Sequence, residues 1–435
     1  MISKKPHYVF MLGDYYPNYS ANGLCAKKII EVLKSKTDIT VICYKSIVNL
    51  PTEEIVDSQR IIRIETTEHK IRNRINHVLS DEESGKLKKK IHLALLRVIQ
   101  LTRYANSIFS KRNIKKTYHQ EFLEALNKIK DPIDVIIPFC FPFEAIYAAL
   151  AYKQKYNRAV SVIPYLFDKF SVSETLHRTS WNKRLKLKSH LNLEKRVLIE
   201  SNKVFATFDW KNHLSENFPD HMGGITFTNI PALTEIKSGK VVNYDNDKVN
   251  IVYAGALNRK NRSPLYTLKI IERITSTNKS IVFHIYSKGD CDEIIRKYVD
   301  NNPVNIYNHG SVNTDSAYAA LKASDFLMSI GNFDITQTPS KIYEYMALGK
   351  PIIHMYHKDQ DPIIDLLELY PKSICIKQQK DIKEEDVSKL IEFIIGNKDC
   401  TDIQFKEIKK LFINATPEWT ADLIINSTKK RGELA

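Results

Sequence analysis

The feature that most constrains this chain is a repeated alternation of short apolar runs with longer amphipathic segments. In the C-terminal half, NIVYAG is followed by SPLYTLKIIERI, IVFHIYS by DEIIRKYV, and VNIYNHG by SAYAALKAS. Short apolar runs bounded by turn residues predict buried strands, and the amphipathic segments between them predict helices. Because strand–helix–strand units build parallel sheets, the sequence predicts an α/β fold with doubly wound parallel sheets.

The alternation occurs twice, and an irregular segment separates the two series. The first series begins at YVFML and continues through DVIIPF, SVIPYLF and KVFATF, whereas residues 228–248 are rich in turn residues and show no clear period. We therefore predict two domains facing a cleft, at residues 1–235 and 250–415, joined by a linker at 236–249. The amphipathic segment after Pro417 predicts a C-terminal helix within 416–435 that packs back on the first domain.

Charge and cysteine usage narrow the functional classes. The chain of 435 residues carries 65 Lys and Arg against 50 Asp and Glu, a net charge of +15, which favours nucleic acid, phosphorylated ligands or an anionic membrane as partners. The six cysteines are scattered without a CxxC pair, which argues against a zinc site and a disulfide framework and favours a reducing cytoplasm. No stretch approaches the roughly 20 apolar residues that span a bilayer.

The segment TQTPSKIYEYMALGKPII combines a polar turn, a helical pattern and an apolar strand. Thr338 is expected to be the helix N-cap and Pro339 the first helical residue. The backbone N–H groups of Ser340 and Lys341 would then lie at a helix N-terminus, which attracts anions. Glu344 shares the face of Lys341 and has the chemistry to accept hydrogen bonds from sugar hydroxyls. A capped helix with a surface Lys–Glu pair is the alternative, and the segment alone does not separate the two.

Two further basic residues follow neighbouring strands. Arg262 comes after NIVYAG, and Lys288 comes directly after IVFHIYS. Because ligands bind at the carboxyl ends of parallel strands, both side chains are expected to converge with Lys341 at one sheet edge. Arginine binds phosphate oxygens in pairs and lysine supplies a point charge, so the three predict a diphosphate site without a metal. Solvated surface residues are the alternative.

Three Asp-x-Asp triplets invite a metal-dependent alternative. They lie at residues 245–247, 290–292 and 359–361. Paired aspartates of this kind hold Mg²⁺ or Mn²⁺ in some transferases. The first triplet falls in the linker, the second follows a lysine, and the third precedes a helix, so we expect turn chemistry at all three and no metal site.

Taken together, these motifs resemble a GT-B glycosyltransferase, a fold of two Rossmann-like domains, and are most similar to the retaining glycosyltransferase family 4. The match rests on PSKIYEYMALGKPII, on YAGAL with a following arginine, and on IYSKGD. The resemblance covers nearly the whole chain and is strongest over residues 251–356. It implies that the second domain binds the donor: Arg262 and Lys288 hold the diphosphate, the helix start near Ser340 and Lys341 caps it, and Glu344 binds the ribose.

The resemblance also assigns residues in the first domain and shows a departure. Gly23 matches a glycine-bearing loop that approaches the donor, and Asp168 corresponds to an acceptor-side acidic residue, our candidate catalytic group. The family pattern places a glutamate eight residues before Glu344, where this chain has Thr336. Gln337 or Thr338 would then supply the missing hydrogen bonds to the transferred sugar, whose identity stays open.

Two strongly basic segments point to a membrane surface. Residues 84–118 contain ten Lys or Arg and no acid, and residues 177–190 add five more. Basic amphipathic segments suit an anionic bilayer. A solvated helix face is one alternative, and nucleic acid is another, although no nucleic-acid recognition motif is present. We predict a cytoplasmic protein on the inner face of the plasma membrane, with no nucleic-acid partner.

The predicted function is transfer of a sugar from a UDP- or GDP-linked donor to a surface glycan or a lipid-linked acceptor. No cofactor is expected beyond this nucleotide sugar, which is a substrate. The resemblance implies retention of the anomeric configuration. A nucleotide-sugar epimerase of the same fold and a non-catalytic anion-binding or nucleic-acid-binding protein remain the alternatives.

Overall fold

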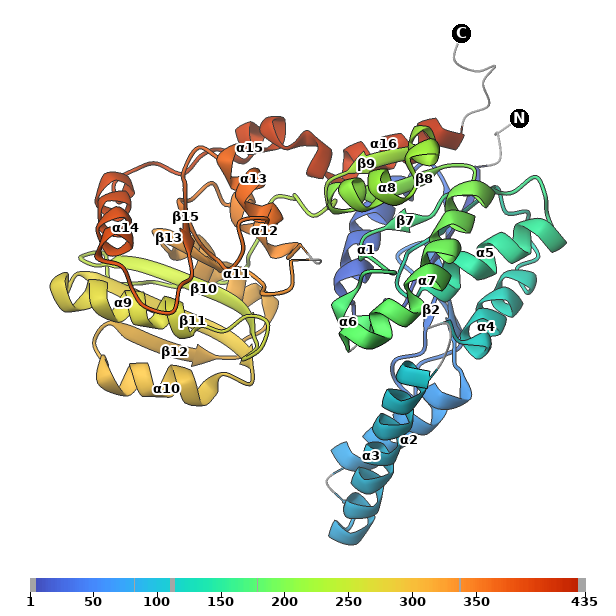
Figure 1. The fold of residues 1–435 in the computed structure, drawn as a ribbon, viewed down its shortest axis with the longest axis horizontal. Helices are drawn as coiled ribbons and strands as arrows, with labels where there is room; N and C mark the ends of the chain where they lie inside the picture. The colour runs from blue at the N-terminus through green and yellow to red at the C-terminus, as the bar shows by residue number, and fades with distance from the viewer. Residues whose placement is uncertain (1–4, 82, 110–113, 178, 336–337, 429–435) are drawn as a thin grey trace. The chain divides into compact units, whose positions relative to one another are not determined.

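The computed structural model describes residues 5–81, 83–109, 114–177, 179–335 and 338–428. The chain divides into two compact units, one formed by Met1–Pro231 with Pro417–Ala435 and the other by Ala232–Thr416 (Figure 1). The boundary expected after residue 235 lies a few residues beyond the observed one. Both units are α/β, and the prediction of two doubly wound parallel sheets is confirmed.

The first unit is built on a six-stranded sheet in the order β3-β4-β2-β1-β5-β6, and only β3 runs antiparallel to its neighbour. Tyr8, Val9 and Phe10 in the central strand are almost completely buried, as expected for a strand covered on both faces. The strands are β1 (His7–Met11), β2 (Asp38–Tyr44), β3 (Glu53–Val56), β4 (Gln59–Ile64), β5 (Val135–Pro138) and β6 (Ser161–Val162).

The segment SVIPYLF, expected to be one strand, is divided between two sheets. Its first part is β6, and its second part, β7, joins a separate three-stranded parallel sheet in the order β7-β8-β9. Pro164 lies between the two parts and has no backbone N–H to continue the first ladder, which explains the division. The strands of the small sheet are β7 (Tyr165–Leu166), β8 (Val204–Thr207) and β9 (Ile225–Thr228).

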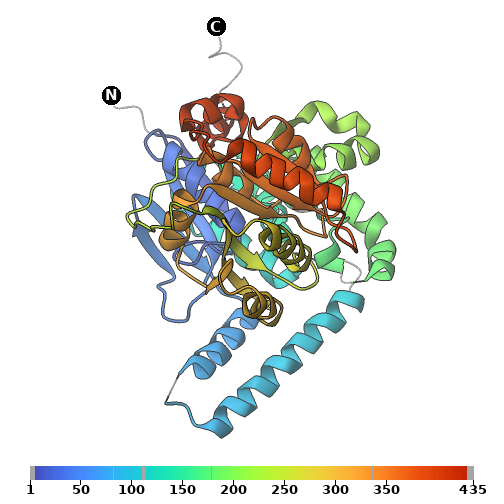
Figure 2. The same ribbon diagram turned by 90° about the vertical axis from the view of Figure 1, so that its left-hand side faces the viewer.

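Helices cover the first unit, and the last helix of the chain returns to it. The C-terminal helix packs against α1, and the Tyr8 hydroxyl lies 2.8 Å from Thr428 Oγ1. Figures 1 and 2 show α2 and α3 as a hairpin that projects from the body of this unit. The helices are α1 (Ala21–Leu33), α2 (Thr67–Ser80), α3 (Lys86–Phe109), α4 (Lys116–Asn127), α5 (Phe143–Lys155), α6 (Glu174–His177), α7 (Ser180–Glu200), α8 (Lys211–Asn217) and α16 (Pro417–Thr428).

The second unit contains one six-stranded sheet in the order β12-β11-β10-β13-β14-β15, with every pair parallel. The strand order reverses between β10 and β13, which is where open parallel sheets bind ligands. The strands are β10 (Val249–Leu257), β11 (Ile281–Gly289), β12 (Ile306–Gly310), β13 (Phe326–Ile330), β14 (Ile352–Tyr356) and β15 (Ser373–Lys377).

Helices on both faces of the second sheet enclose its core. Buried apolar side chains from the strands and from α9, α10 and α14 form one continuous cluster. Burial on both faces fixes the sheet and therefore the positions of the loops at its carboxyl edge. The helices are α9 (Leu265–Thr277), α10 (Asp292–Asn301), α11 (Thr314–Ala323), α12 (Lys341–Ala347), α13 (Pro362–Glu368), α14 (Glu384–Asn397) and α15 (Phe405–Leu411).

Candidate active site

Arg262 closes a tight turn after β10. The backbone N–H of Asn258 donates to the carbonyl oxygen of Arg262 at 3.0 Å, and the N–H of Arg262 donates back at 2.9 Å. The Asn258 side chain also accepts hydrogen bonds from the N–H groups of Lys260 and Asn261, at 3.0 and 3.1 Å. These bonds hold the turn rigid, so the position of the Arg262 side chain is determined by the backbone beneath it.

The loop after β13 is fastened to this turn at the point where the strand order reverses. The backbone N–H of Phe333 donates to the Asn261 carbonyl oxygen at 2.6 Å, and the N–H of Asp334 donates to Asn261 Oδ1 at 2.8 Å. Arg262 Nε donates to Oδ1 of the buried Asn332 at 3.0 Å. These contacts orient the guanidinium group and join the two loops that flank the switch point.

Lys288 lies at the same edge of the sheet, one residue before an obligatory glycine. In the β10–β11 ladder Lys288 pairs with Ala256 and Gly289 with Leu257. Gly289 has φ +142°, and a Cβ atom there would lie 1.8 Å from the Leu257 carbonyl oxygen. Only glycine fits this position, so the SKGD motif extends the ladder far enough to bring the exposed Lys288 side chain beside the Arg262 turn.

Asp290, the last residue of that motif, supports the neighbouring turn. Its carboxylate accepts a hydrogen bond from the Arg259 backbone N–H at 2.8 Å, and its carbonyl oxygen accepts one from Arg259 Nε at 2.8 Å. The carboxylate thus joins the loops after β10 and β11, a structural role that agrees with the turn chemistry expected for this Asp-x-Asp triplet.

The helix that carries Lys341 and Glu344 begins later than predicted. Helix α12 starts at Lys341, with Ser340 at the N-cap position in helical dihedrals, φ −60° and ψ −18°. The prediction of Thr338 as N-cap and Pro339 as first helical residue is therefore wrong. The start of α12 is tightly wound, because the N–H groups of Ile342 and Tyr343 donate to carbonyl oxygens three residues earlier. Because α12 has only 7 residues, we attribute the positive potential here to side chains.

Arg262 and Lys288 both influence the charge of Lys341. Burial lowers the pKa of Lys341; Glu344 opposes this shift, whereas Arg262 and Lys288 add to it. Lys341 Nζ lies 3.9 Å from Glu344 Oε2, and the two side chains are 36% and 17% exposed. The structure therefore brings Arg262 and Lys288 close to Lys341, beside the Glu344 carboxylate, and an anion bound there would relieve the repulsion that Lys341 experiences.

Two tyrosines that the sequence reasoning missed support α12. Tyr318 in α11 hydrogen bonds with Glu344, and its own pKa is raised by burial and then by the Glu344 charge. The Tyr345 hydroxyl donates to the Ala254 carbonyl oxygen at 3.2 Å and accepts from the Ala254 N–H at 3.1 Å, which ties α12 to β10. Among 22 tyrosines no sequence signal distinguished these two.

Thr336 and Gln337 lie outside the described residues, so the assignment of Gln337 stays a prediction. Thr338 lies two residues before Ser340, ahead of the helix.

Gly23 lies in the first turn of α1 and not in the loop where it was expected. Its N–H donates to the hydroxyl of the N-cap residue Ser20 at 3.1 Å. A Cβ atom at this position would lie 2.4 Å from the Asp14 carbonyl oxygen. The structural reason for glycine here is thus the close approach of the loop after β1 to the start of α1.

Asp168 lies beside the start of α1, where it contacts Asn22, a residue 146 positions away in the chain. Its Oδ2 accepts a hydrogen bond from Asn22 Nδ2 at 3.3 Å. Burial raises the pKa of the Asp168 carboxyl group, the hydrogen bond from Asn22 opposes the shift, and the charge of Asp209 adds to it. Asn22, next to Gly23, is therefore a first-unit residue that contacts the candidate catalytic group, and the sequence did not predict this contact.

The other two Asp-x-Asp triplets have structural roles. Asp245 accepts the Asp247 N–H at 3.0 Å in a turn, Asp359 pairs with Lys377 at 2.6 Å, and Asp361 caps α13 by accepting the Ile363 N–H at 3.0 Å. Across the described residues, no group of three or more His, Cys, Asp or Glu side chains is arranged to hold a metal ion.

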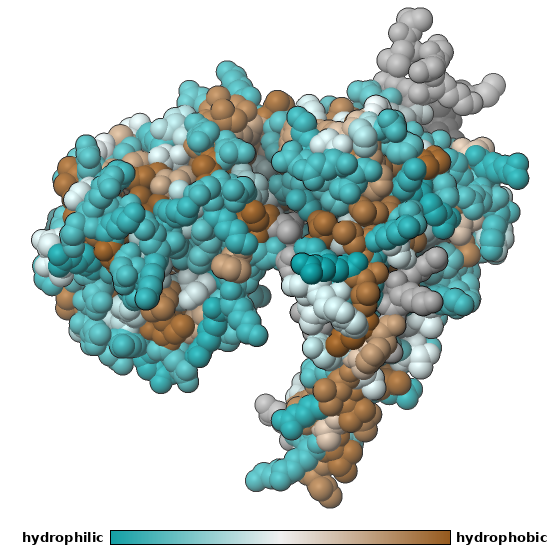
Figure 3. Space-filling model, viewed as in Figure 1, coloured by the Kyte–Doolittle hydropathy of each residue, from teal (hydrophilic) through white to brown (hydrophobic). Residues whose placement is uncertain are grey.

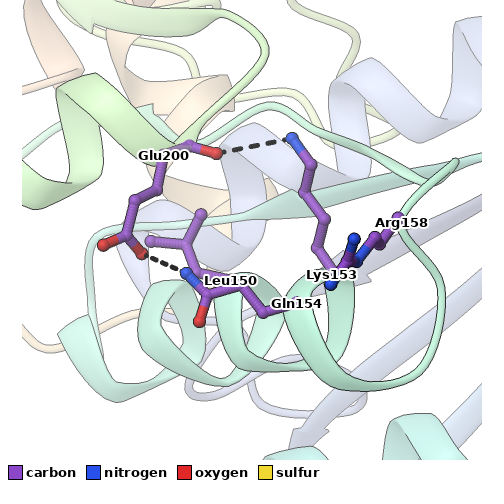
Figure 4. Close-up of a pocket in the computed structure, with 5 residues that line it drawn as sticks. All are labelled: Leu150, Lys153, Gln154, Arg158 and Glu200. Atoms are coloured by element: carbon purple, nitrogen blue, oxygen red, sulfur yellow. Dashed lines mark hydrogen bonds between the residues drawn. The ribbon is translucent and has the colours of Figure 1, made fainter.

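A surface pocket in the first unit is lined by none of these residues. Lys153 Nζ donates to the Glu200 carbonyl oxygen at 3.4 Å and Gln154 Nε2 donates to Glu200 Oε2 at 3.0 Å, so the pocket follows the contact between α5 and the end of α7 (Figure 4). We interpret it as a helix-packing feature. It is lined by Leu150, Lys153, Gln154, Arg158 and Glu200.

Comparison with solved structures places the fold. Sucrose-phosphate synthase from Thermosynechococcus elongatus is 11% identical with a TM-score of 0.59, over 97% of this chain and 98% of that chain. Trehalose 6-phosphate synthase from Burkholderia multivorans is 10% identical with a TM-score of 0.58, over 98% and 96%. A UDP-N-acetylglucosamine 2-epimerase is 11% identical with a TM-score of 0.52, over 97% and 95%.

These similarities extend over nearly the whole length of both chains, and at such low identity they show the fold alone. No family model matches this sequence, and no curated protein matches it. The architecture shared with these structures is the GT-B arrangement of two Rossmann-like domains that the resemblance implied.

Proposed function

We propose that this protein is a glycosyltransferase that moves a sugar from a nucleotide-diphosphate sugar, UDP- or GDP-linked, to an acceptor. The observation that carries the proposal is the meeting of Arg262, Lys288 and Lys341 beside Glu344 at the switch point of the second sheet. Such a site suits a diphosphate joined to a group rich in hydroxyls. The proposal is also supported by the fold shared with sucrose-phosphate and trehalose 6-phosphate synthases.

The chemical role of the cations follows from where charge develops. When the bond between the sugar and the diphosphate breaks, negative charge grows on the departing phosphate oxygens. Arg262, oriented by Asn332, has the geometry to donate two hydrogen bonds to that group, and Lys288 and Lys341 add point charges. Because the turns that hold these residues are fixed by backbone hydrogen bonds, little reorganisation is needed during the reaction.

Glu344 is proposed to bind the nucleotide ribose. A carboxylate has about four acceptor positions, so one hydrogen bond with Tyr318 leaves others for ribose hydroxyls. Tyr318 acts as a positioning residue in this scheme, since it holds the carboxylate without touching the reacting atoms. Ser340, Gln337 and Thr338 stay assigned to the donor side as part of the proposal.

We further propose metal-independent transfer with retention of configuration, to a surface glycan or a lipid-linked acceptor at the inner face of the plasma membrane. Asp168 would act on the acceptor side. The test is transfer from a UDP-sugar with EDTA present, followed by NMR of the product. Undiminished activity and the donor's anomeric configuration are expected. Loss of activity that Mn²⁺ restores, or an inverted product, would contradict this part of the proposal.

A nucleotide-sugar epimerase is the second candidate, favoured by the similarity to the UDP-N-acetylglucosamine 2-epimerase. The two functions differ in their need for an acceptor. Incubation with UDP-N-acetylglucosamine alone would give a second epimer from an epimerase, whereas a transferase leaves the sugar's stereochemistry unchanged until an acceptor is added. A protein that binds UDP but yields neither product with any donor would be a non-catalytic anion-binding protein.

A further inference from the structure

Helix α3 exposes apolar side chains to an unusual degree. It is 24 residues long, and none of its side chains that the structure describes is buried. By contrast, α5 buries eight of its 13 residues. Figure 3 shows brown, apolar side chains along the arm that α2 and α3 form. The large exposed apolar residues are Leu87, Ile91, Leu93, Leu95, Val98, Leu101, Tyr104 and Phe109, with Leu87 at 74%, Leu101 at 67% and Phe109 at 81% exposed.

Most of these residues form one stripe along the helix. At 3.6 residues per turn, six of them fall within a sector about 120° wide. The other face carries the half-buried His92, Leu96 and Ile99 where α3 packs on α2. The contact with α2 thus leaves the stripe uncovered within the described residues. The apolar stripe, as we use the term, consists of Leu87, Ile91, Leu95, Val98, Leu101 and Phe109.

Positive charge borders the apolar stripe on both sides. Helix α3 contains six Lys or Arg and no Asp or Glu. By the same helical spacing, Lys86, Lys90 and Arg97 lie along one edge and Lys88 along the other. In the part of the chain that the structure describes, Arg103 is the α3 residue that forms an ion pair, with Glu68 at 2.8 Å, and these four cations form none.

We propose that α3 is a membrane-docking arm that lies flat in the interface of an anionic bilayer. The apolar stripe enters the acyl boundary, and the four flanking cations contact lipid headgroups. A second copy of the chain fits less well, because pairing two apolar stripes would bring two sets of uncompensated cations together. Among the described residues no helix has the length and apolarity to cross a bilayer. This inference deepens the membrane location in the proposed function by naming the segment that docks, and it uses none of the donor-site residues.

The test is co-sedimentation of the full chain, without nucleotide, with vesicles of phosphatidylcholine with or without phosphatidylglycerol. Binding should require phosphatidylglycerol, and added salt should weaken it without abolishing it, since the inserted stripe is not screened. Replacing the four cations by glutamate should reduce binding on the order of a thousandfold, because each basic residue at an anionic leaflet contributes roughly fivefold and the four contributions multiply. The charge-reversal variant is Lys86→Glu, Lys88→Glu, Lys90→Glu and Arg97→Glu.

A second variant removes apolar surface and keeps every charge. It should lose the salt-resistant part of binding, and it should fold normally because the replaced side chains are exposed. A matched control reverses four exposed cations in the second unit and should bind like the wild type. The apolar variant is Leu87→Ser, Ile91→Ser and Leu95→Ser, and the control is Arg296→Glu, Lys297→Glu, Lys406→Glu and Lys410→Glu.

Several outcomes would overturn the inference. They are absence of binding to anionic vesicles, equal binding to neutral vesicles, or equal binding by the wild type and both α3 variants. A dimer in vesicle-free solution that the apolar variant converts to a monomer would instead assign the stripe to a second copy. Calorimetry of UDP binding by the same variants separates this test from the donor-site proposal. Variants that no longer bind vesicles should still bind UDP like the wild type.

Discussion

The carboxyl edge of the second sheet and the projecting α3 arm use their residues in opposite ways. At the sheet edge, polar side chains such as Asn261 and Asn332 are engaged by neighbouring loops, and glycine is enforced at residue 289. On α3, large apolar side chains are exposed and four cations form no ion pair with described residues. The comparison teaches that the first region is organised before any ligand arrives, whereas the second offers surface that only a partner would cover.

The largest expected effect is at Gly289. Gly289→Ala forces a Cβ atom against the Leu257 carbonyl oxygen in a backbone conformation that L-residues rarely adopt, so the free energy of unfolding should fall by more than about 3 kcal/mol. A Cβ atom added at Gly85, just before α3, would meet no atom within 4 Å, so Gly85→Ala should change stability by less than about 0.5 kcal/mol. Urea unfolding measures both; similar losses would remove the distinction between the two regions.

Next in size are the side chains that would meet the donor. Glu344→Ala should weaken UDP binding by about 1.5–3 kcal/mol, as for a hydrogen bond to a charged group. Lys341→Ala should also weaken UDP binding. The same replacement should weaken UMP binding less, because UMP carries one phosphate fewer. Isothermal calorimetry gives both values. Unchanged affinity in both variants would show that the organised edge is not the donor site.

The lowered pKa of Lys341 predicts a pH dependence. Burial, with Arg262 and Lys288 adding, disfavours its charged form, so Lys341 loses its proton below the ordinary lysine value of 10.5. Above that lowered pKa the site has one cation fewer, and UDP affinity should fall as the pH rises towards it from neutrality. The free energy of unfolding should rise over the same pH range, because the unfolded chain there binds more protons than the folded one.

The conservative variant sharpens this pH test. Arginine keeps its charge throughout the accessible range, so in Lys341→Arg the affinity for UDP should vary much less with pH. Calorimetry at a series of alkaline pH values measures the two curves. Parallel curves for the wild type and Lys341→Arg would show that another group causes the dependence.

A smaller effect is expected at Tyr318. Tyr318→Phe removes the hydroxyl that holds Glu344 and keeps the ring, so UDP affinity should fall by about 0.5–1.5 kcal/mol with little change in stability. Tyr307→Phe is the matched control, because that tyrosine is also in the second unit and its hydroxyl donates to the Val304 carbonyl oxygen, three residues earlier, at 3.4 Å. If both variants bind UDP like the wild type, Tyr318 has no positioning role.

The smallest effect is expected on the arm. Leu101 is 67% exposed, so Leu101→Ala should change the free energy of unfolding by less than about 0.5 kcal/mol. Leu268, which is fully buried in α9, should lose about 2–5 kcal/mol on the same replacement. Thermal unfolding compares them. A large loss for Leu101→Ala would mean that the apolar stripe is covered within the protein itself.

The sequence by itself determined the class of fold and the kinds of chemistry available. Alternating apolar and amphipathic runs predict parallel sheets, because burial on both faces imposes that pattern locally. Arg262, Lys288 and Lys341 were found for the same reason, since each follows a strand or turn signal within a few residues. The absence of acidic residues from residues 84–118 could also be identified from the sequence, because it is a property of composition alone.

Only the tertiary structure decided how these pieces meet. Tertiary packing determined three boundaries that local signals did not predict, because neighbouring elements compete for the same backbone groups. They are the late start of α12 at Lys341, the place of Gly23 inside α1 and the division of SVIPYLF. The partners of the site depend on packing: Asn332 reaches Arg262 across 70 residues of chain, and Asn22 reaches Asp168 across 146. A strand signal is a property of neighbouring residues, whereas a hydrogen bond between distant loops exists only after the sheet has brought their ends together.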